Sequence, residues 1–197
     1  MKPGFVIGNG KSRLVLDLGD LKKHGRVYGC NALYRDFTPD VLVATDPGIT
    51  KEIEASGYAL KNTFYTRQPN ESLGSQKIAY HFGFSSGPIA VKYAAEAGHA
   101  VIYLAGFDLQ GQDGRQNNVY SGSDNYRTSE EKETYYGNWV KQLAQVFNEH
   151  KNQRFIRLTT QDGIVPVQWL SCANHANQLI SDFAPNINNR PWQRSRE

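Results

Sequence analysis

The chain has 197 residues, a length suited to one domain with a sizeable core. Hydrophobic residues make up 39% of it, and no stretch approaches the roughly 18 apolar residues that a transmembrane helix needs. We therefore expect no membrane insertion. Because the apolar run at residues 5–7 is too short for a signal peptide, we also expect a cytoplasmic protein. The net charge of +3 is compatible with a phosphate-bearing ligand but does not establish nucleic-acid binding.

Short apolar runs alternate with amphipathic stretches, which is typical of a mostly parallel sheet flanked by helices. Strands are predicted at residues 4–7, 26–30, 41–44, 60–65, 101–105 and 155–158. Helices are predicted at residues 14–22 (or a turn), 49–56, 85–98 and 128–149, with a partly helical segment at 167–183. Residues 67–84 and 106–127 show no clear period, and the first of these segments is interpreted as a lid or substrate loop.

The sequence therefore predicts a Rossmann-like α/β fold in a single domain over residues 1–185. A basic tail follows at residues 186–197 and carries three arginines and one tryptophan. This tail is interpreted either as a solvated terminus or as an arm that touches a polyanion or a neighbouring subunit. Cys30 and Cys172 lack the spacing of metal ligands and are expected to be buried, reduced thiols.

Polar or glycine-rich positions follow several of the predicted strands. Ligands of open parallel sheets bind beyond the carboxyl ends of the strands, so we expect these positions to share one edge. The predicted nucleotide-binding residues are Gly8, Asn9, Gly10, Ser12, Asn31, Asp46, Ser85, Ser86 and Gly87. Glycine lets a backbone approach a phosphate, asparagine offers a donor and an acceptor, and a helix N-terminus attracts anions.

Each of these features also has a structural interpretation. The loop at residues 8–12 has neither Walker A nor G-x-G-x-x-G spacing, and a tight turn also uses glycine and asparagine. Asp108 is interpreted as a base, a ribose ligand or a turn residue, and Tyr120 and Tyr126 as phosphate donors or as loop anchors. The sequence contains no D-x-D pair, H-E-x-x-H motif or cysteine cluster, so neither a metal nor another cofactor is expected.

Four motifs occur in a particular order along the chain. They are Gly8-Asn9-Gly10-Lys11-Ser12, Gly29-Cys30-Asn31, Ser85-Ser86-Gly87 and Ile102-Tyr103-Leu104-Ala105-Gly106-Phe107-Asp108. The set resembles the bacterial sialyltransferases that decorate lipo-oligosaccharides, whose pattern is G-N-G-P-S, C-N, S-G and I-Y-L-x-G-x-D, over roughly residues 4–127. The G-N-G-x-S start also resembles the 6-hydroxymethylpterin pyrophosphokinase-like proteins.

The resemblance implies a fold like a GT-A variant that holds a CMP-sugar without a metal. It implies that Asn9, Asn31, Ser86 and Gly87 contact the nucleotide and its phosphate. Tyr120 and Tyr126 would then stabilise the departing phosphate, on which charge develops in the transition state. The chain departs from the pattern at Lys11, which replaces a proline, and in having no histidine between His99 and His150. The general base is left open among Asp108, Asp124, His81 and His175.

The first hypothesis is a metal-independent glycosyltransferase that moves a sugar from a CMP- or UDP-type donor to a hydroxyl acceptor. The acceptor is a glycan or, on the basis of charge alone, a hydroxylated base in DNA. A nucleotide-cleaving or phosphotransfer enzyme on the same fold is the second hypothesis, and a non-catalytic nucleotide-binding module is the third. Enzymes of the family that the chain resembles commonly self-associate, so a homo-oligomer is also an open expectation.

Overall fold

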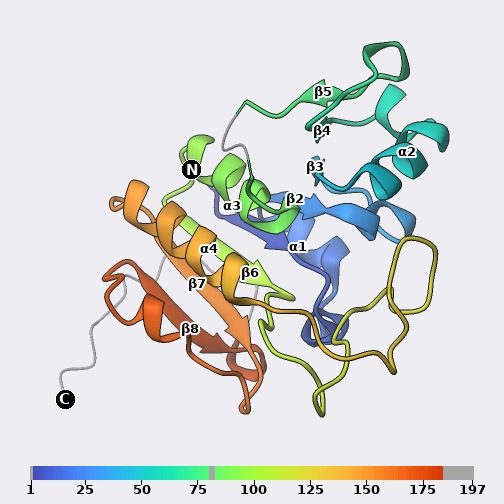
Figure 1. Cartoon of the computed structure of the whole chain (residues 1–197). Helices are drawn as coiled ribbons and strands as arrows, with labels where there is room; N and C mark the ends of the chain where they lie inside the picture. Colours follow the sequence, from blue (N-terminus) through green and yellow to red (C-terminus); the bar gives the residue numbers. More distant parts are fainter. Residues whose placement is uncertain (1, 80–82, 184–197) are drawn as a thin grey trace, which may run out of the picture.

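The sheet of this protein is entirely parallel and has eight strands in the computed structural model, which describes residues 2–79 and 83–183. The strands are β1 (Gly4–Ile7), β2 (Arg26–Cys30), β3 (Val41–Ala44), β4 (Phe64–Thr66), β5 (Gln76–Lys77), β6 (Val101–Ala105), β7 (Arg154–Thr159) and β8 (His175–Leu179). Their order is β5-β4-β3-β2-β1-β6-β7-β8 (Figure 1). This arrangement confirms the predicted Rossmann-like α/β fold.

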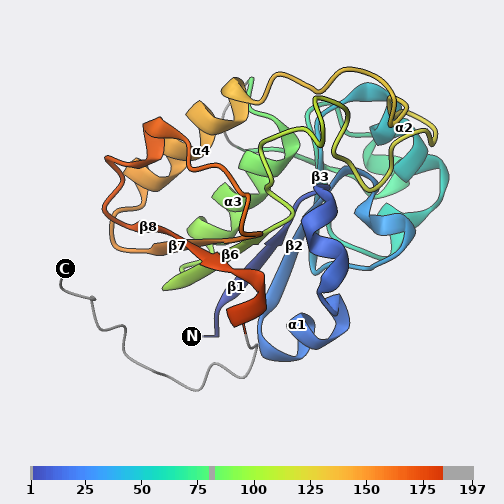
Figure 2. The same ribbon diagram turned by 90° about the horizontal axis from the view of Figure 1, so that it is seen from below.

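Two helices cover each face of the sheet (Figure 2). The helices are α1 (Leu18–His24), α2 (Pro47–Ala55), α3 (Ser86–Glu96) and α4 (Gly137–Glu149). Side chains of a strand point alternately to the two faces, so in β1 Phe5 and Ile7 pack with α1 and α2, whereas Val6 packs with α3 and α4. Because both faces are buried, the central strands are apolar at nearly every position.

The direction in which strands are added reverses between β1 and β6. From β1 the chain builds outward to β5, and it then crosses over to β6 and builds outward to β8. Ligands of open α/β sheets bind at such a switch point, beyond the carboxyl ends of the strands. The loops after β1 and β6 contact each other there: the Gly8 N–H donates to Ala105 O at 2.8 Å, and the Gly10 N–H donates to Gly106 O at 2.9 Å.

Two segments near the β5 edge of the sheet, residues 60–65 and 67–84, differ from what the sequence predicted. Residues 60–65 were expected to form a strand, but Tyr58–Leu60 is a 3-10 turn and β4 begins only at Phe64. The segment at residues 67–84 contains a 3-10 turn (Glu71–Leu73) and the short strand β5, which pairs with β4. The segment at residues 14–22, predicted as a helix or a turn, contains the end of a 3-10 turn (Lys11–Val15) and most of α1.

The prediction of a helix over residues 128–149 is wrong in its first part, because α4 begins at Gly137. The backbone of the preceding residues is instead paired with an earlier part of the same long loop. The Gln116 N–H donates to Glu131 O at 3.0 Å, and the Glu133 N–H donates to Gly114 O at 3.0 Å. These tertiary hydrogen bonds use backbone groups that a helix would need for itself.

The expectation of a partly helical segment at 167–183 is also largely wrong. Its centre is the edge strand β8, with 3-10 turns at Val167–Trp169 and Ile180–Asp182. The strand forms because the outer edge of β7 offers unpaired backbone groups, and five residue pairs align in register from Phe155 and His175 onward. The predicted tail at 186–197 lies outside the described residues. Among the described helices, none combines the length and apolar composition needed to cross a membrane.

Candidate functional site

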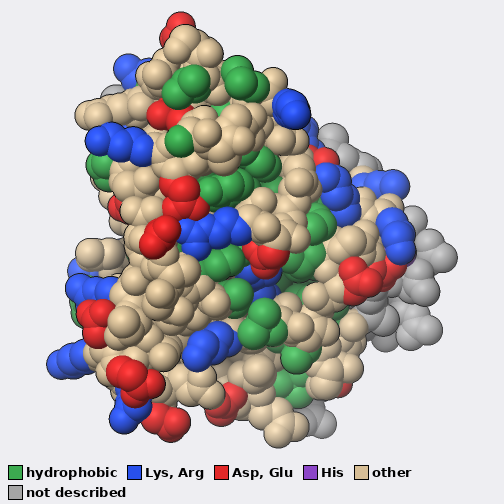
Figure 3. All heavy atoms as spheres, turned by 90° about the vertical axis from the view of Figure 1, so that its right-hand side faces the viewer, with side chains coloured by type: hydrophobic (Ala, Val, Ile, Leu, Met, Phe, Trp, Pro, Cys, Tyr) green, Lys and Arg blue, Asp and Glu red, His purple; other side chains and the backbone are tan. Residues whose placement is uncertain are grey.

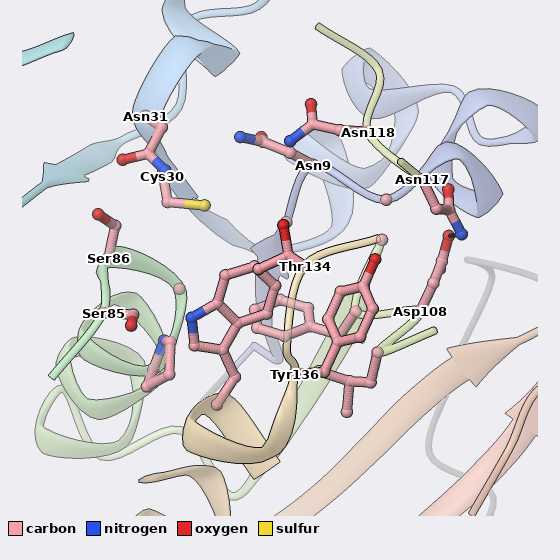
Figure 4. A pocket seen from close by; sticks show the side chains of 18 of the residues that line it. Asn9, Cys30, Asn31, Ser85, Ser86, Asp108, Asn117, Asn118, Thr134 and Tyr136 are labelled. Carbon is pink, nitrogen blue, oxygen red and sulfur yellow. Dashed lines mark hydrogen bonds between the residues drawn. The ribbon is translucent and has the colours of Figure 1, made fainter. Parts of the chain in front are cut away.

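A cavity of about 410 Å³ lies beyond the carboxyl ends of β1, β2, β3 and β6. This size is within the range of small-molecule sites. The predicted residues that line it are Gly8, Asn9, Gly10, Asn31, Asp46, Ser85, Ser86, Gly87 and Asp108 (Figure 4). We call it the first cavity. The structure therefore brings residues from separate parts of the sequence together around one cavity, because the strands that they follow are neighbours in the sheet.

The loop after β1 requires glycine at positions 8 and 10 because its backbone packs directly against the backbone of the loop after β6. A Cβ atom at Gly8 would lie 2.5 Å from Gly106 O, and one at Gly10 would lie 2.8 Å from the same oxygen. The N–H groups of this loop are mostly used inside the protein: Lys11 N–H donates to Asn117 Oδ1 at 3.0 Å. The glycines thus shape the wall of the cavity, and they offer a phosphate fewer free N–H groups than the sequence suggested.

Two asparagines present hydrogen-bond acceptors without a partner. Asn9 Oδ1 and Asn31 Oδ1 are both buried, and neither accepts a hydrogen bond from any described residue. The Asn31 backbone has a φ of 54°, in the left-handed region that asparagine tolerates better than most residues. Buried polar atoms are almost always paired, so these two oxygens are suited to O–H or N–H donors of a ligand.

The N-terminus of α3 opens onto the same cavity. Ser85 is the N-cap, but its side chain caps nothing, and its own N–H donates to Gln142 Oε1 at 2.8 Å. The Ser86 hydroxyl is held against Thr45, whose N–H donates to Ser86 Oγ at 3.0 Å. Among the described residues, no group accepts from the N–H of Ser86 or Gly87. Free N–H groups at a helix N-terminus favour an anion such as a phosphate.

Aromatic side chains form another part of the wall, and the sequence analysis did not find them. Tyr136 and Trp139, at the start of α4, are arranged edge to face with ring centroids 5.4 Å apart. Phe107, next to Asp108, also lines the cavity. Such rings can stack on a nucleobase. Their spacing of three residues was the available signal, since it places both rings on one side of a helix start.

Asp108 is held firmly at the junction of the two loops. Its Oδ2 accepts from the Ser12 N–H at 3.1 Å and from Asn117 Nδ2 at 3.0 Å, and its Oδ1 accepts from the Ser12 hydroxyl. A carboxylate has about four lone-pair positions, so roughly one stays available. Ser12 itself does not line the first cavity. Asp46 does, and its exposed carboxylate has no hydrogen-bond partner among the described residues.

Tyr120 and Tyr126 lie behind the wall and do not line the cavity. The Tyr126 hydroxyl oxygen accepts from Asn9 Nδ2 at 3.3 Å and from the Ala32 N–H at 3.1 Å. Burial raises the pKa of Tyr126, so its hydroxyl keeps a proton that it can donate. The Tyr120 hydroxyl instead lies between Arg13 and Asp36. The predicted leaving-group role of the two tyrosines stays a prediction, with Tyr126 nearer to the cavity lining.

The other candidate bases lie elsewhere. His175 packs against Phe147 and Trp169, and burial, together with the nearby charge of Arg157, lowers its pKa to about 4. Asp124 is exposed and does not line the first cavity, and His81 lies outside the described residues. Within residues 2–79 and 83–183, no group of three or more His, Cys, Asp or Glu side chains is placed to share a metal ion.

The segment at residues 83–87 also reads G-x-S-x-G, a pattern found at the nucleophile of serine hydrolases. In those enzymes the serine lies on a strained turn between a strand and a helix. Here Ser85 has φ −75° and ψ 159°, which is ordinary extended backbone. The structure therefore gives no support to a serine nucleophile at this position.

Comparisons with protein-family models, with curated proteins and with solved structures gave no match to this chain. The fold class is thus established by the arrangement of the strands and helices alone. The class of ligand has to be inferred from the chemistry of the cavity.

Proposed function

We propose that the protein is a metal-independent glycosyltransferase that uses a sugar activated by a nucleotide of the CMP or UDP type. The observation that carries this proposal is the pairing, in one cavity, of two unpartnered amide oxygens with an uncapped helix N-terminus. The oxygens belong to Asn9 and Asn31, and the free N–H groups to Ser86 and Gly87. Together they match a ligand that has hydroxyl or amino donors at one end and a phosphate at the other.

The aromatic residues complete this match. Trp139 and Tyr136 can cover the face of a base, while the asparagine oxygens accept from ribose hydroxyls or from a base amino group. The uncapped start of α3 would neutralise part of the phosphate charge, which a metal ion does in many other transferases. Tyr126 supports the same role because its hydroxyl contacts Asn9 from behind.

In the proposed reaction, an acceptor oxygen attacks the anomeric carbon while the bond from that carbon to the phosphate oxygen breaks. The phosphate leaves with the bonding electrons, and the acceptor hydroxyl gives its proton to a carboxylate. Asp46 and Asp108 are the carboxylates of the first cavity within the described residues. A single displacement of this kind inverts the configuration at the anomeric carbon.

The test is a titration of the purified protein with CMP, UDP and GDP, read by thermal shift with and without EDTA. We expect at least one nucleotide to raise the melting temperature, and EDTA to leave this effect unchanged. Turnover of the matching nucleotide-sugar, measured as release of the free nucleotide, follows. No shift with any nucleotide would overturn the proposal.

Two further outcomes would redirect it. Mg²⁺-dependent release of AMP or pyrophosphate would identify a nucleotide-cleaving or phosphotransfer enzyme instead. Tight binding without turnover in the presence of any acceptor would identify a binding module.

A further inference from the structure

A second cavity, of about 520 Å³, lies directly beside the first. Asp108 and Asn117 line both, so these two side chains form the wall between them. The other side of the second cavity is formed by the loop that follows β7, including Thr160 and Asp162. A compound in the second cavity would therefore meet a compound in the first at this shared wall.

Hydrogen bonds fix the two loops that surround the second cavity. Gln110 Oε1 accepts from the Ile164 N–H at 2.8 Å, and Gln110 Nε2 donates to Asp162 O at 3.3 Å. Beneath them, the fully buried Arg157 guanidinium donates to the carbonyl oxygens of Ile164 and Phe107. The loops after β6 and β7 are thus tied together by side chains from both strands' ends.

The lining of the second cavity is polar and carries an excess of negative charge. Its charged residues are one cation, Lys11, and three carboxylates, Asp108, Asp113 and Asp162. Among the described residues, no aromatic side chain lines the second cavity, in contrast to the first. Three carboxylates beside one ammonium group would repel a chain of phosphates. Lysine, carboxylate, amide and hydroxyl groups offer both donors and acceptors to an uncharged compound with many hydroxyls.

The surface around these cavities agrees with this preference. Figure 3 shows the side of the molecule toward which β2 and β6 point in Figure 1. On this face Lys and Arg side chains are interspersed with Asp and Glu side chains, and hydrophobic groups lie among them. Among the described residues on this face, the Lys and Arg side chains do not form a continuous basic stripe of the kind that tracks a nucleic-acid backbone.

We propose that the second cavity is the acceptor subsite and takes an uncharged pyranoside. This inference rests on the proposed transferase function of the first cavity. The acceptor hydroxyl lies at the shared wall, where its oxygen bonds to the anomeric carbon of the donor as the phosphate leaves. Its proton passes to Asp108, which is the carboxylate on both cavities and has a lone-pair position left. Of the two acceptors first considered, a glycan is therefore favoured over DNA.

Saturation-transfer NMR tests the acceptor subsite directly. The probes are the methyl glycosides of galactose, glucose, mannose and N-acetylglucosamine, and a short single-stranded oligodeoxynucleotide. Two substitutions in the lining, Lys11→Gln and Asp113→Asn, should weaken the binding of a glycoside. They should leave the fold unchanged because neither side chain has a hydrogen-bond or ion-pair partner among the described residues. Two matched controls, Lys61→Gln and Glu71→Gln, remove the same charges from exposed positions away from both cavities.

We expect a signal from at least one glycoside, and an affinity reduced about tenfold in the double variant Lys11→Gln/Asp113→Asn but not in the controls. The inference would be overturned by any of three results. These are no signal from any glycoside, equal glycoside affinity in the double variant and the wild type, or oligonucleotide binding that the double variant abolishes. CMP, UDP and GDP binding is measured on the same samples. Nucleotide binding without glycoside binding would refute the acceptor subsite and leave the proposed transferase function standing. Glycoside binding without nucleotide binding would show a sugar site but refute the transferase function, and with it the acceptor role of this cavity.

Discussion

The guanidinium of Arg13 donates a hydrogen bond to the Tyr120 hydroxyl oxygen at 2.7 Å. The same hydroxyl donates its proton to Asp36, and Arg13 is only 3% exposed. These three residues come from the turn after β1, the segment after β2 and the long loop after β6. The interaction therefore anchors the long loop, which carries part of the cavity wall, to the first half of the sheet.

Tyr120→Phe should lower the free energy of unfolding by about 1–3 kcal/mol, because Arg13 would lose a buried acceptor. Urea unfolding measures the change. Tyr135→Phe is the control, since Tyr135 is 73% exposed and should cost nothing measurable. If Tyr120→Phe instead keeps its stability but turns over a nucleotide-sugar much more slowly, the leaving-group role predicted from the sequence is the better assignment.

Asn31→Gly should weaken nucleotide binding about tenfold while the fold is retained. Glycine adopts a φ of 54° without strain, so this variant keeps the backbone conformation of residue 31 and removes only the side-chain oxygen. Isothermal calorimetry with the nucleotide that gives a thermal shift measures the effect. Unchanged affinity would show that Asn31 Oδ1 does not receive a ligand donor.

Gly8→Ala should separate the loops after β1 and β6, because its Cβ would lie 2.5 Å from a backbone oxygen that has no room to yield. We expect a loss of nucleotide binding together with a lower melting temperature. Gly19→Ala, in α1, meets only Asp17 Oδ1 at 3.1 Å, which is the side-chain oxygen that caps the helix, so its effect on stability should be much smaller than that of Gly8→Ala. A Gly8→Ala protein that binds nucleotide normally would contradict the packing explanation of this glycine.

The ion pair between Arg35 and Glu52 should give the protein a measurable acid sensitivity. Hydrogen bonds from the Arg35 guanidinium lower the pKa of Glu52 to about 2, from an ordinary value of 4.5. A carboxyl whose pKa is lowered by folding adds stability above its unfolded pKa, and this stability is lost as the pH falls from about 4.5 toward 2.

Glu52→Gln should therefore be less stable than the wild type at pH 6, and the difference should shrink as the pH falls toward 2. Urea unfolding at a series of pH values measures it, with Glu71→Gln as the control because Glu71 is exposed. A stability difference that does not change with pH would exclude the ion pair as its source.

The central strands could be predicted because their burial on both faces leaves a clear apolar signature, as in Val101–Ala105. Residues that line the first cavity and follow these strands could be predicted for a related reason, since a parallel sheet places the carboxyl ends of its strands together. Asn31 is an example, because its position directly after β2 was enough to predict that it lies at the carboxyl edge of the sheet.

What could not be predicted depends on contacts between distant segments. Gln116 and Glu131 pair through their backbones, and no local pattern indicates that this pairing displaces the first turns of a helix. The edge strand β8 forms because β7 offers it a partner, although three of the five side chains of β8 are polar. The aromatic wall at Trp139 and the buried place of Tyr120 likewise follow from tertiary packing.

The hydrogen bonds from Gly8 to Ala105 and from Gly10 to Gly106 have a consequence for how the protein folds. The loop that opens the chain takes its shape from a strand made much later in synthesis, so contacts of high sequence separation must form before the site exists. A nascent or truncated chain that ends before β6 would hold Asn9 and Asn31 without the wall that orients them. If the proposed nucleotide site is correct, a nucleotide would bind and stabilise only a chain in which the sheet is complete.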